Sequence, residues 1–332
     1  MKKVILTFDY ELFFGNNSGT IQKSVIEPTD KILEKLQEIN GCAVFFIDYL
    51  MIKYLLTENE STQREADLII NQLRKIVAGG SRIELHLHPH WIDAHYTSDG
   101  RWDFSNFSHY SLSSLPKSKV TSLFNEGCDF LSGIVQEIEP GYRIKVFRAG
   151  GWSILPFEHM QEGFKSSGIF LDSSVIRGSL IEKDGYRVDF REISSADFYR
   201  FSENILEEKV AGEFIEVPIT KYKLSVFDAI LATFDSVLRK NRYRNLADGS
   251  HARIGSNKRT LFQKIKMIFD ERVFTVNSSS ARILKKSILN SNHELIVFSG
   301  HPKDFTAATL SNIEVVSEVS MLTTYNKLFC KL

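Results

Sequence analysis

The sequence has few cysteines. Its 332 residues include three, Cys42, Cys128 and Cys330, which lie far apart along the chain. An odd number of distant cysteines gives no disulfide framework and no zinc site built from paired cysteines. A reducing compartment is therefore the expected environment.

Long apolar runs and excess charge are also missing. The amino-terminal run MKKVILTF is followed by Asp9 and Glu11, so it does not reach the ~7 to 15 apolar residues of a signal-peptide core. No stretch approaches the ~18 apolar residues of a membrane span, and the cytoplasm is the expected location. Lys and Arg (41) balance Asp and Glu (41), so net charge does not indicate a nucleic-acid partner, and nothing indicates the oligomeric state.

Short apolar runs that alternate with helical segments are what the sequence does contain. One segment, 25–41, has Thr29 or Asp30 as a helix cap, an apolar stripe and a stop at Gly41. Residues 68–80 and 120–142 repeat the pattern. The seven runs that read as buried strands are 4–8, 43–47, 82–87, 144–147, 168–171, 214–219 and 294–298. Strands alternating with helices predict a parallel sheet in an α/β protein, and seven of them favour a barrel, here as a single domain over residues 1–332.

Two segments depart from this repeat. Residues 92–118 are polar and aromatic without a period, which predicts a long loop over the barrel mouth. Residues 239–266 contain nine Lys or Arg against one Asp. The simplest interpretation of this basic segment is a solvated insertion, and the alternative is a contact with phosphates or an anionic membrane surface.

Polar side chains follow several of the predicted strands, where the active site of a β/α barrel is built. Asp9 and Glu11 follow the first run and, two residues apart, point to the same side. His86, His88 and His90 follow the third run, but Pro89 disturbs the strand. Ligation of a metal by His86 and His88 needs only a continuing strand, whereas ligation by His86 and His90 needs a turn. Imidazoles clustered with a carboxylate predict a zinc site with an open position.

Three more strand ends carry such residues. Arg148 follows the fourth run and can hold a carboxylate in its ionised form. Asp172 follows the fifth run, and His301 follows the seventh. Five of the seven predicted strand ends therefore carry a polar residue.

In motif order, these residues resemble the polysaccharide deacetylase family, also called the NodB homology domain or carbohydrate esterase family four. The matching motifs are TFDYE, CAVFFID (42–48), His86 to His90 as HxxxH, RAGGW, LDSS and GHP, which extend from Asp9 to His301. The match is closest to members encoded with bacterial surface-polysaccharide synthesis genes. The resemblance implies a distorted (β/α)7 barrel.

The resemblance also implies residue roles. The metal, Zn²⁺ or another divalent transition metal, would be bound by Glu11, His86 and His90, with His88 a bystander. Glu11 stands where the commonest family pattern has an Asp adjacent to the first one. The implied catalytic residues are Asp9 as general base, Arg148 to position and tune it, Asp172 to support the arginine or the acid, and His301 as general acid.

The implied reaction is hydrolysis of an N-acetyl group on a sugar. The backbone N–H of Tyr10 is a candidate donor to the oxyanion, and Trp91, Trp152 and aromatic residues of 92–118 are candidates for stacking on a sugar. A nucleotide-linked or lipid-linked sugar is the expected substrate, with its phosphates or the membrane surface met by residues 239–266. Two alternatives remain open: an amidohydrolase-type barrel acting on a non-carbohydrate amide, whose HxH pair normally follows the first strand, and a non-catalytic sugar-binding barrel.

Overall fold

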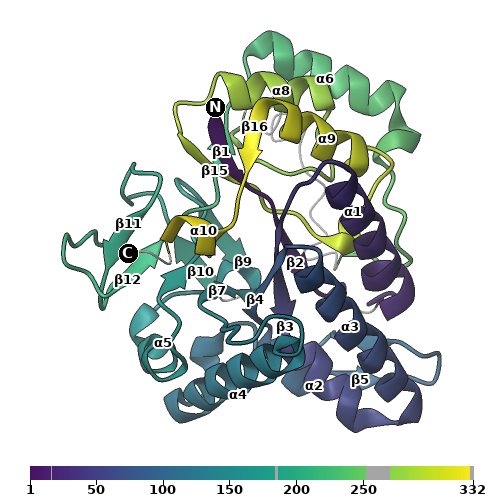
Figure 1. Cartoon of the computed structure of the whole chain (residues 1–332), viewed down its shortest axis with the longest axis vertical. Coiled ribbons are helices and arrows are strands. Elements are labelled where there is room, and N and C mark those ends of the chain that lie inside the picture. Colours follow the sequence, from purple (N-terminus) through teal and green to yellow (C-terminus); the bar gives the residue numbers. More distant parts are fainter. Residues whose placement is uncertain (16, 184–185, 252–269, 330–332) are drawn as a thin grey trace.

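The computed structural model describes residues 1–15, 17–183, 186–251 and 270–329. Its central feature is a seven-stranded sheet, in the order β11-β12-β8-β7-β4-β3-β2 (Figure 1). All neighbours pair in parallel except β11 and β12. The strands are β2 (Thr7–Tyr10), β3 (Val44–Asp48), β4 (Arg82–Leu87), β7 (Val146–Ala149), β8 (Leu171–Asp172), β11 (Tyr199–Phe201) and β12 (Phe214–Glu216).

A second, three-stranded sheet has the order β15-β1-β16, all parallel, from β1 (Lys2–Ile5), β15 (Leu295–Val297) and β16 (Ser320–Leu322). Only Leu6 separates β1 from β2, so the first predicted apolar run (4–8) continues from the three-stranded sheet into the seven-stranded one. Hydrogen bonds from Gly300 N to Thr7 O (3.0 Å) and from Thr220 N to Val297 O (3.1 Å) also link them. The mixed α/β class and the mostly parallel sheet are confirmed, whereas closure of a barrel by one continuous ladder is not detected among the described strands.

Each of the seven predicted apolar runs overlaps a strand of one of these sheets, with ends shifted by up to three residues. All five residues of β3 are buried, as expected for a parallel sheet that is covered on both faces. The sequence did not predict the antiparallel pairs at the periphery, because their strands are short and half-exposed. These are β5 (His95–Tyr96) with β6 (Trp102–Asp103), β9 (Leu180–Lys183) with β10 (Tyr186–Asp189), and β13 (Lys221–Tyr222) with β14 (Arg272–Val273).

The three predicted helices are present with shifted ends. In α1, Ile32 and Leu36 are buried as the apolar stripe predicts, but the helix begins before Thr29 because the π-helical turn η1 (Gln22–Ile26) leads into it. Asn59 caps α3 together with Thr62, earlier than predicted. The helices are α1 (Glu27–Glu38), α2 (Tyr49–Glu58), α3 (Glu60–Ala78), α4 (Lys117–Val135), α5 (Gln161–Ser167), α6 (Val226–Leu238), α8 (Ala281–Leu289), α9 (Thr309–Val319) and α10 (Tyr325–Phe329).

The two irregular segments are more ordered than predicted. The 92–118 segment contains the β5–β6 hairpin and the short helix η3 (Leu112–Ser114). The basic segment begins with η6 (Lys240–Tyr243), and its residues 252–266 lie outside the described part of the chain. Among the described residues, no helix is both long and apolar enough to span a membrane.

Candidate active site

Residues at the carboxyl ends of the strands line a cavity of about 300 Å³. Asp9 and Glu11 come from the end of β2 and the histidines from the end of β4, while His301 and Lys303 follow β15. Asp48, His86 and Arg148 stand opposite one another on the neighbouring strands β3, β4 and β7. The parallel register therefore brings together residues that are far apart in the sequence.

Asp9 forms a buried ion pair with Arg148. Arg148 is fully buried, and its Nη1 donates to Asp9 Oδ1 at 2.7 Å and to Thr7 Oγ1 at 2.7 Å. Its Nε donates to the carbonyl oxygen of Ser173. Burial would raise the pKa of Asp9, but Arg148, helped by His86 and His301, outweighs it and lowers that pKa. Asp9 is therefore held as a carboxylate, as a general base requires.

Glu11, His86 and His88 bring one possible ligand atom each into a buried cluster. These atoms lie within 4.8 Å of one another. Glu11 Oε2 is 3.0 Å from His86 Nε2 and 2.6 Å from His88 Nε2. A carboxylate and two imidazoles, with space beside them in the cavity, suit a divalent transition metal with an open coordination position.

The contacts of His86 show that a cation fits this cluster. His86 Nδ1 lies 2.6 Å from the carbonyl oxygen of Arg148, so this nitrogen must carry a proton and donate. Nε2 then faces the Glu11 carboxylate, and this contact is favourable when a proton or a metal ion lies between the two atoms. Burial would lower the pKa of His86, but Glu11 and Asp9 outweigh it and raise that pKa. A backbone carbonyl behind the other ring nitrogen is also the usual support of a metal-bound histidine.

His88, not His90, faces Glu11. The backbone of His88 is extended (φ −113°, ψ 101°), so its side chain keeps the alternation of β4 and lies on the same side as that of His86. Pro89 begins the 3-10 helix η2 (Pro89–Asp93), which takes His90 out of this alternation. His90 Nδ1 is 3.4 Å from His88 Nδ1, on the ring edge away from Glu11. The predicted set with His90 as ligand and His88 as bystander does not match this arrangement.

The ring of His88 is held from several sides. Phe14 stacks on it with centroids 4.1 Å apart. An added Cβ on Gly150 would lie 2.6 Å from His88 Nδ1 and 2.6 Å from Leu87 O, so only glycine allows this approach. Burial lowers the pKa of His88 to about 4, against the opposite effect of Glu11. The ring is therefore neutral near pH 7, which is the form that binds metals.

His301 lies at the cavity with both ring nitrogens near carboxylates. Its Nε2 is 3.6 Å from Asp9 Oδ2, and its Nδ1 is 3.1 Å from Asp304 Oδ2. Asp304 Oδ1 is 2.7 Å from Nε2 of His251, which also lines the cavity. Burial would lower the pKa of His301, but Asp304 and Asp9 outweigh it and raise that pKa. His301 is thus suited to donate a proton at neutral pH.

Lys303 brings a buried ammonium to the cluster. It is 3% exposed, and its Nζ donates to Glu11 Oε1 at 2.7 Å and to Leu12 O at 2.8 Å. Burial would raise the pKa of Glu11, but Lys303 and the two histidines lower it well below its usual value. Because Lys303 occupies Oε1, Glu11 turns Oε2 toward the histidines.

Asp172 lies behind the cavity and has a different contact from the one expected. Its carboxylate accepts hydrogen bonds from Ser174 N and Ser174 Oγ, and Ser174 Oγ in turn accepts from Ala149 N. Among the described residues, no hydrogen bond joins Asp172 to Arg148 or His301. Asp172 instead stands opposite Glu216 on β12, and both are fully buried. Asp172 therefore supports the backbone of β7 through Ser174, and it interacts with Arg148 through charge without a hydrogen bond.

The three proposed substrate-binding residues have different positions. Tyr10 is buried on the other side of β2, where its hydroxyl donates to Gln72 Oε1 at 2.7 Å. Trp91 is fully buried and donates from Nε1 to Asp48 Oδ2 at 2.7 Å. Neither side chain lines the cavity, so the structure does not support stacking of Trp91 on a sugar there, and the proposed donation from the backbone N–H of Tyr10 stays a prediction. Trp152 does line it, beside Phe107 and Tyr110 of the 92–118 segment.

Sequence reasoning missed Asp48, His251, Lys303 and Asp304. A signal existed for three of them, because Asp48 ends the second apolar run and Lys303 and Asp304 follow His301 within GHPKDF. His251 lies in the basic segment, where its spacing indicates nothing. Only the fold brings it to Asp304.

The sequence matches no protein-family model and no curated protein. Solved structures do match. A Mycobacterium smegmatis protein assigned as a polysaccharide deacetylase has 14% identity and a TM-score of 0.49, over 98% of this chain and 88% of the other. The Bc1960 peptidoglycan N-acetylglucosamine deacetylase has 13% identity and a TM-score of 0.42, over 99% of this chain and 88% of the other. BA3943, a CE4 family pseudoenzyme from Bacillus anthracis, has 10% identity and a TM-score of 0.41, over 98% of this chain and 65% of the other. At these identities and scores, the function is argued from the site itself.

Proposed function

We propose that this chain is a metal-dependent hydrolase that removes an N-acetyl group from a sugar. The observation that carries the proposal is the contact of Glu11 Oε2 with His86 Nε2 and His88 Nε2, 2.6 to 3.0 Å, beside the ion pair of Asp9 with Arg148. A metal position next to an ionised carboxylate is what amide hydrolysis by an activated water requires. The motif order from TFDYE to GHP supports the same family of reactions.

Each residue then has a role that follows from its contacts. Glu11, His86 and His88 would hold the metal, with Zn²⁺ the ion best suited to this donor set. When bound, the metal would polarise the acetyl carbonyl and lower the pKa of a water molecule. Asp9 takes the proton of the attacking water, because Arg148 keeps it ionised. His301, supported by Asp304, gives a proton to the leaving amine, so that water and the amide become acetate and a free amine.

The substrate is proposed to be a sugar joined to phosphate, carried by a nucleotide or a lipid, in bacterial surface-polysaccharide synthesis in the cytoplasm. The support is the basic segment. Arg239, Lys240, Arg242 and Arg244 directly precede residues 245–251, which end at His251 in the wall of the cavity. Trp152, Phe107 and Tyr110 provide aromatic surface for a sugar ring.

A second candidate has an observation of its own. The convergence of His86 and His88 is an HxH pair, as in amidohydrolase-type enzymes, although it follows the third predicted strand and not the first. This candidate would hydrolyse an amide that carries no sugar, with the same water-activating residues.

Two measurements test the proposal. Metal analysis of the purified chain should find about one equivalent of zinc or a similar ion, retained in Asp9→Asn while acetate release is lost. Acetate release from nucleotide-linked, lipid-linked and polymeric N-acetyl sugars, with acetylated non-carbohydrate amines in parallel, separates the two candidates. A chain that binds no divalent metal contradicts both, and a metal-bound chain inactive on every amide supports the non-catalytic sugar-binding alternative.

A further inference from the structure

Helix α6 has its apolar side chains facing outward. Its two acidic side chains face α8: Asp228 is 8% exposed and 2.6 Å from Lys286 of α8, and Asp235 lines the same groove. A helix on the surface of a globular domain normally has the opposite orientation. The large apolar side chains that are 36–81% exposed are Val226, Phe227, Ile230, Leu231, Phe234, Val237 and Leu238.

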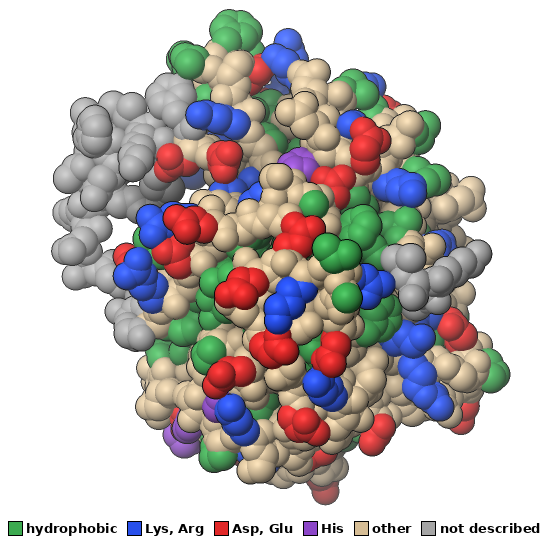
Figure 2. All heavy atoms as spheres, turned by 90° about the vertical axis from the view of Figure 1, so that its left-hand side faces the viewer, with side chains coloured by type: hydrophobic (Ala, Val, Ile, Leu, Met, Phe, Trp, Pro, Cys, Tyr) green, Lys and Arg blue, Asp and Glu red, His purple; other side chains and the backbone are tan. Residues whose placement is uncertain are grey.

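These seven side chains form one continuous face, because their spacings of three and four residues are those of a single helix side. Figure 1 places α6 at one end of the molecule with α8 beneath it, and Figure 2 shows hydrophobic and basic side chains together at that end. Leu246, 53% exposed, follows in the same segment. An exposed apolar face of this length marks an interaction surface.

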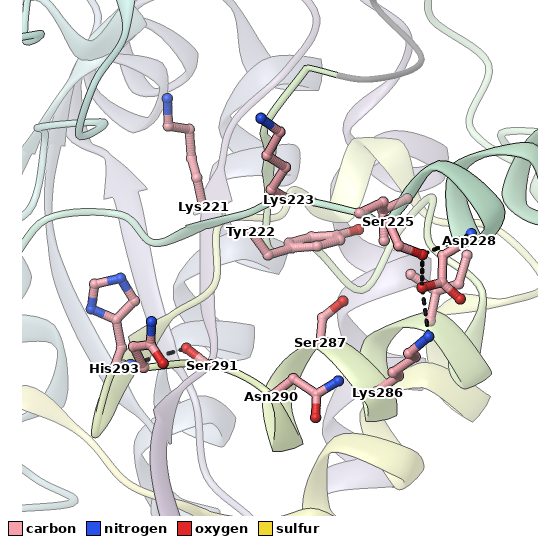
Figure 3. Close-up of a pocket in the computed structure, with 13 residues that line it drawn as sticks. Lys221, Tyr222, Lys223, Ser225, Asp228, Lys286, Ser287, Asn290, Ser291 and His293 are labelled. Carbon is pink, nitrogen blue, oxygen red and sulfur yellow. Dashed lines mark hydrogen bonds and ion pairs between the residues drawn. The ribbon is translucent and has the colours of Figure 1, made fainter.

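Basic residues lie just before and just after α6 in the chain and on the neighbouring helix α8. Four of them follow α6 within six residues, and none of residues 236–247 is acidic: Arg239, Lys240, Arg242 and Arg244. Figure 3 shows Lys221 and Lys223 extending to the same side just before α6. Lys221 is paired with Glu271 and Lys285 of α8 with Glu318, and Lys223, Arg282 and Lys285 are exposed.

We propose that α6 and these basic residues bind the surface of an anionic phospholipid bilayer, with the helix lying in the plane of that surface. Its apolar face would enter the boundary between headgroups and acyl chains to a depth of ~5 to 10 Å. The Lys and Arg side chains would lie within the ~8 to 10 Å over which anionic headgroups attract them at physiological salt. A second copy of the chain fits less well, because it would bring two basic rims together.

The same segment connects the docking face to the active site. After η6, Leu246 N donates to Phe305 O at 3.0 Å, and the chain then reaches His251 at the cavity. Residues 239–251 therefore connect the docking face to the wall of the cavity, which would receive a lipid-linked sugar from the membrane. This last consequence rests on the proposed function, whereas the docking itself does not.

Flotation of the full chain with vesicles tests the docking. Vesicles of phosphatidylcholine alone are compared with vesicles containing about 30% phosphatidylglycerol, which carry the surface charge that basic segments recognise. We expect binding to the anionic vesicles that weakens with added salt. Phe227→Ser with Phe234→Ser should lower this binding at least about tenfold. The matched control is Leu68→Ser with Val210→Ser, two exposed apolar residues away from α6, and it should bind like the unaltered chain.

Three results would overturn the proposal: no binding to anionic vesicles, equal binding to both vesicle types, or undiminished binding by the α6 variant. A change from dimer to monomer in the α6 variant, without vesicle binding by the unaltered chain, would show that a second copy covers the face. Unchanged thermal unfolding and acetate release from a soluble substrate confirm that the variant is folded. Because vesicle binding does not depend on turnover, its failure leaves the proposed hydrolysis intact.

Discussion

His301 is held between two carboxylates, with Nδ1 at 3.1 Å from Asp304 Oδ2 and Nε2 at 3.6 Å from Asp9 Oδ2. Asp304 fixes the ring and favours its protonated form, as a general acid requires. The same carboxylate also contacts His251, which the chain brings back from the basic segment. The proton donor is therefore built from three separate stretches of sequence.

Asp304→Asn should lower kcat/KM by about 10². The amide no longer favours the charged imidazole, so the pKa of His301 falls. Activity is lost when His301 loses its proton, and the alkaline limb of the pH–rate profile should therefore move to lower pH. His251→Asn is the control, and it should shift the limb less because its ring does not contact Asp9. An alkaline limb that stays in place in Asp304→Asn would show that His301 is not the acid.

Replacement of single histidines distinguishes the two possible sets of metal ligands, one with His88 and one with His90. His88→Ala should reduce bound zinc from about one equivalent to less than about 0.1, because His88 Nε2 is 2.6 Å from Glu11 Oε2. His90→Ala should keep most of the metal. Metal content is measured by mass spectrometry after dialysis, with His86→Ala as the positive control. Loss of metal in His90→Ala but not in His88→Ala would show that His86 and His90 are the ligands, as the family motif implies.

Gly150→Ala should disturb the same site without removing a ligand. The added Cβ would lie 2.6 Å from His88 Nδ1 and 2.6 Å from the backbone oxygen of Leu87. Overpacking of this kind costs about 1 to 3 kcal/mol and should weaken metal binding about tenfold or more. Gly133→Ala in α4 is the matched control, since nothing lies within 4 Å of its added Cβ, and it should raise stability by about 0.5 to 1 kcal/mol. Equal effects of the two substitutions in zinc titration and urea unfolding would contradict the packing of Gly150 on His88.

Lys303→Met should make the protein depend on its metal for stability. The substitution leaves Glu11 Oε1 buried without its ammonium, and breaking a buried ion pair costs about 3 to 5 kcal/mol. Bound zinc would neutralise part of the Glu11 charge, so the loss in free energy of unfolding should be smaller with zinc than with a chelator. The comparison is made by urea unfolding in both conditions. The same loss in each would show that Glu11 does not contact the metal.

Glu216→Gln should change how stability depends on pH. Burial and the neighbouring Asp172 raise the pKa of Glu216 well above its ordinary value of 4.5. The folded state then binds a proton that the unfolded state releases, so stability falls as pH rises from 4.5 toward the folded pKa, by up to about 1.4 kcal/mol per pH unit. Glutamine keeps a hydrogen-bond donor for Asp172 without titrating. The free energy of unfolding should therefore depend less on pH, and the variant should become more stable than the unaltered protein as pH rises. Parallel unfolding curves between pH 5 and 8 would contradict a protonated Glu216.

The sequence by itself determined the alternation of strands and helices and the order of polar residues at strand ends. Seven apolar runs predicted the parallel strands, because burial on both faces leaves a readable hydrophobic run. Asp9, Glu11, His86, Arg148 and His301 converge because the carboxyl ends of parallel strands share one edge. These features depend on spacing along the chain, which the sequence contains directly.

Only the tertiary structure decided which side chains meet. The contact of His88, and not His90, with Glu11 depends on the backbone angles of the residue before Pro89. The position of Trp91 outside the cavity depends on its packing in the core, where it is fully buried. Lys303 and His251 reach the site through long-range packing, and α6 has its apolar face outward while Asp228 pairs with Lys286 on another helix. Such pairings are set by contacts across the fold, and no local pattern encodes them.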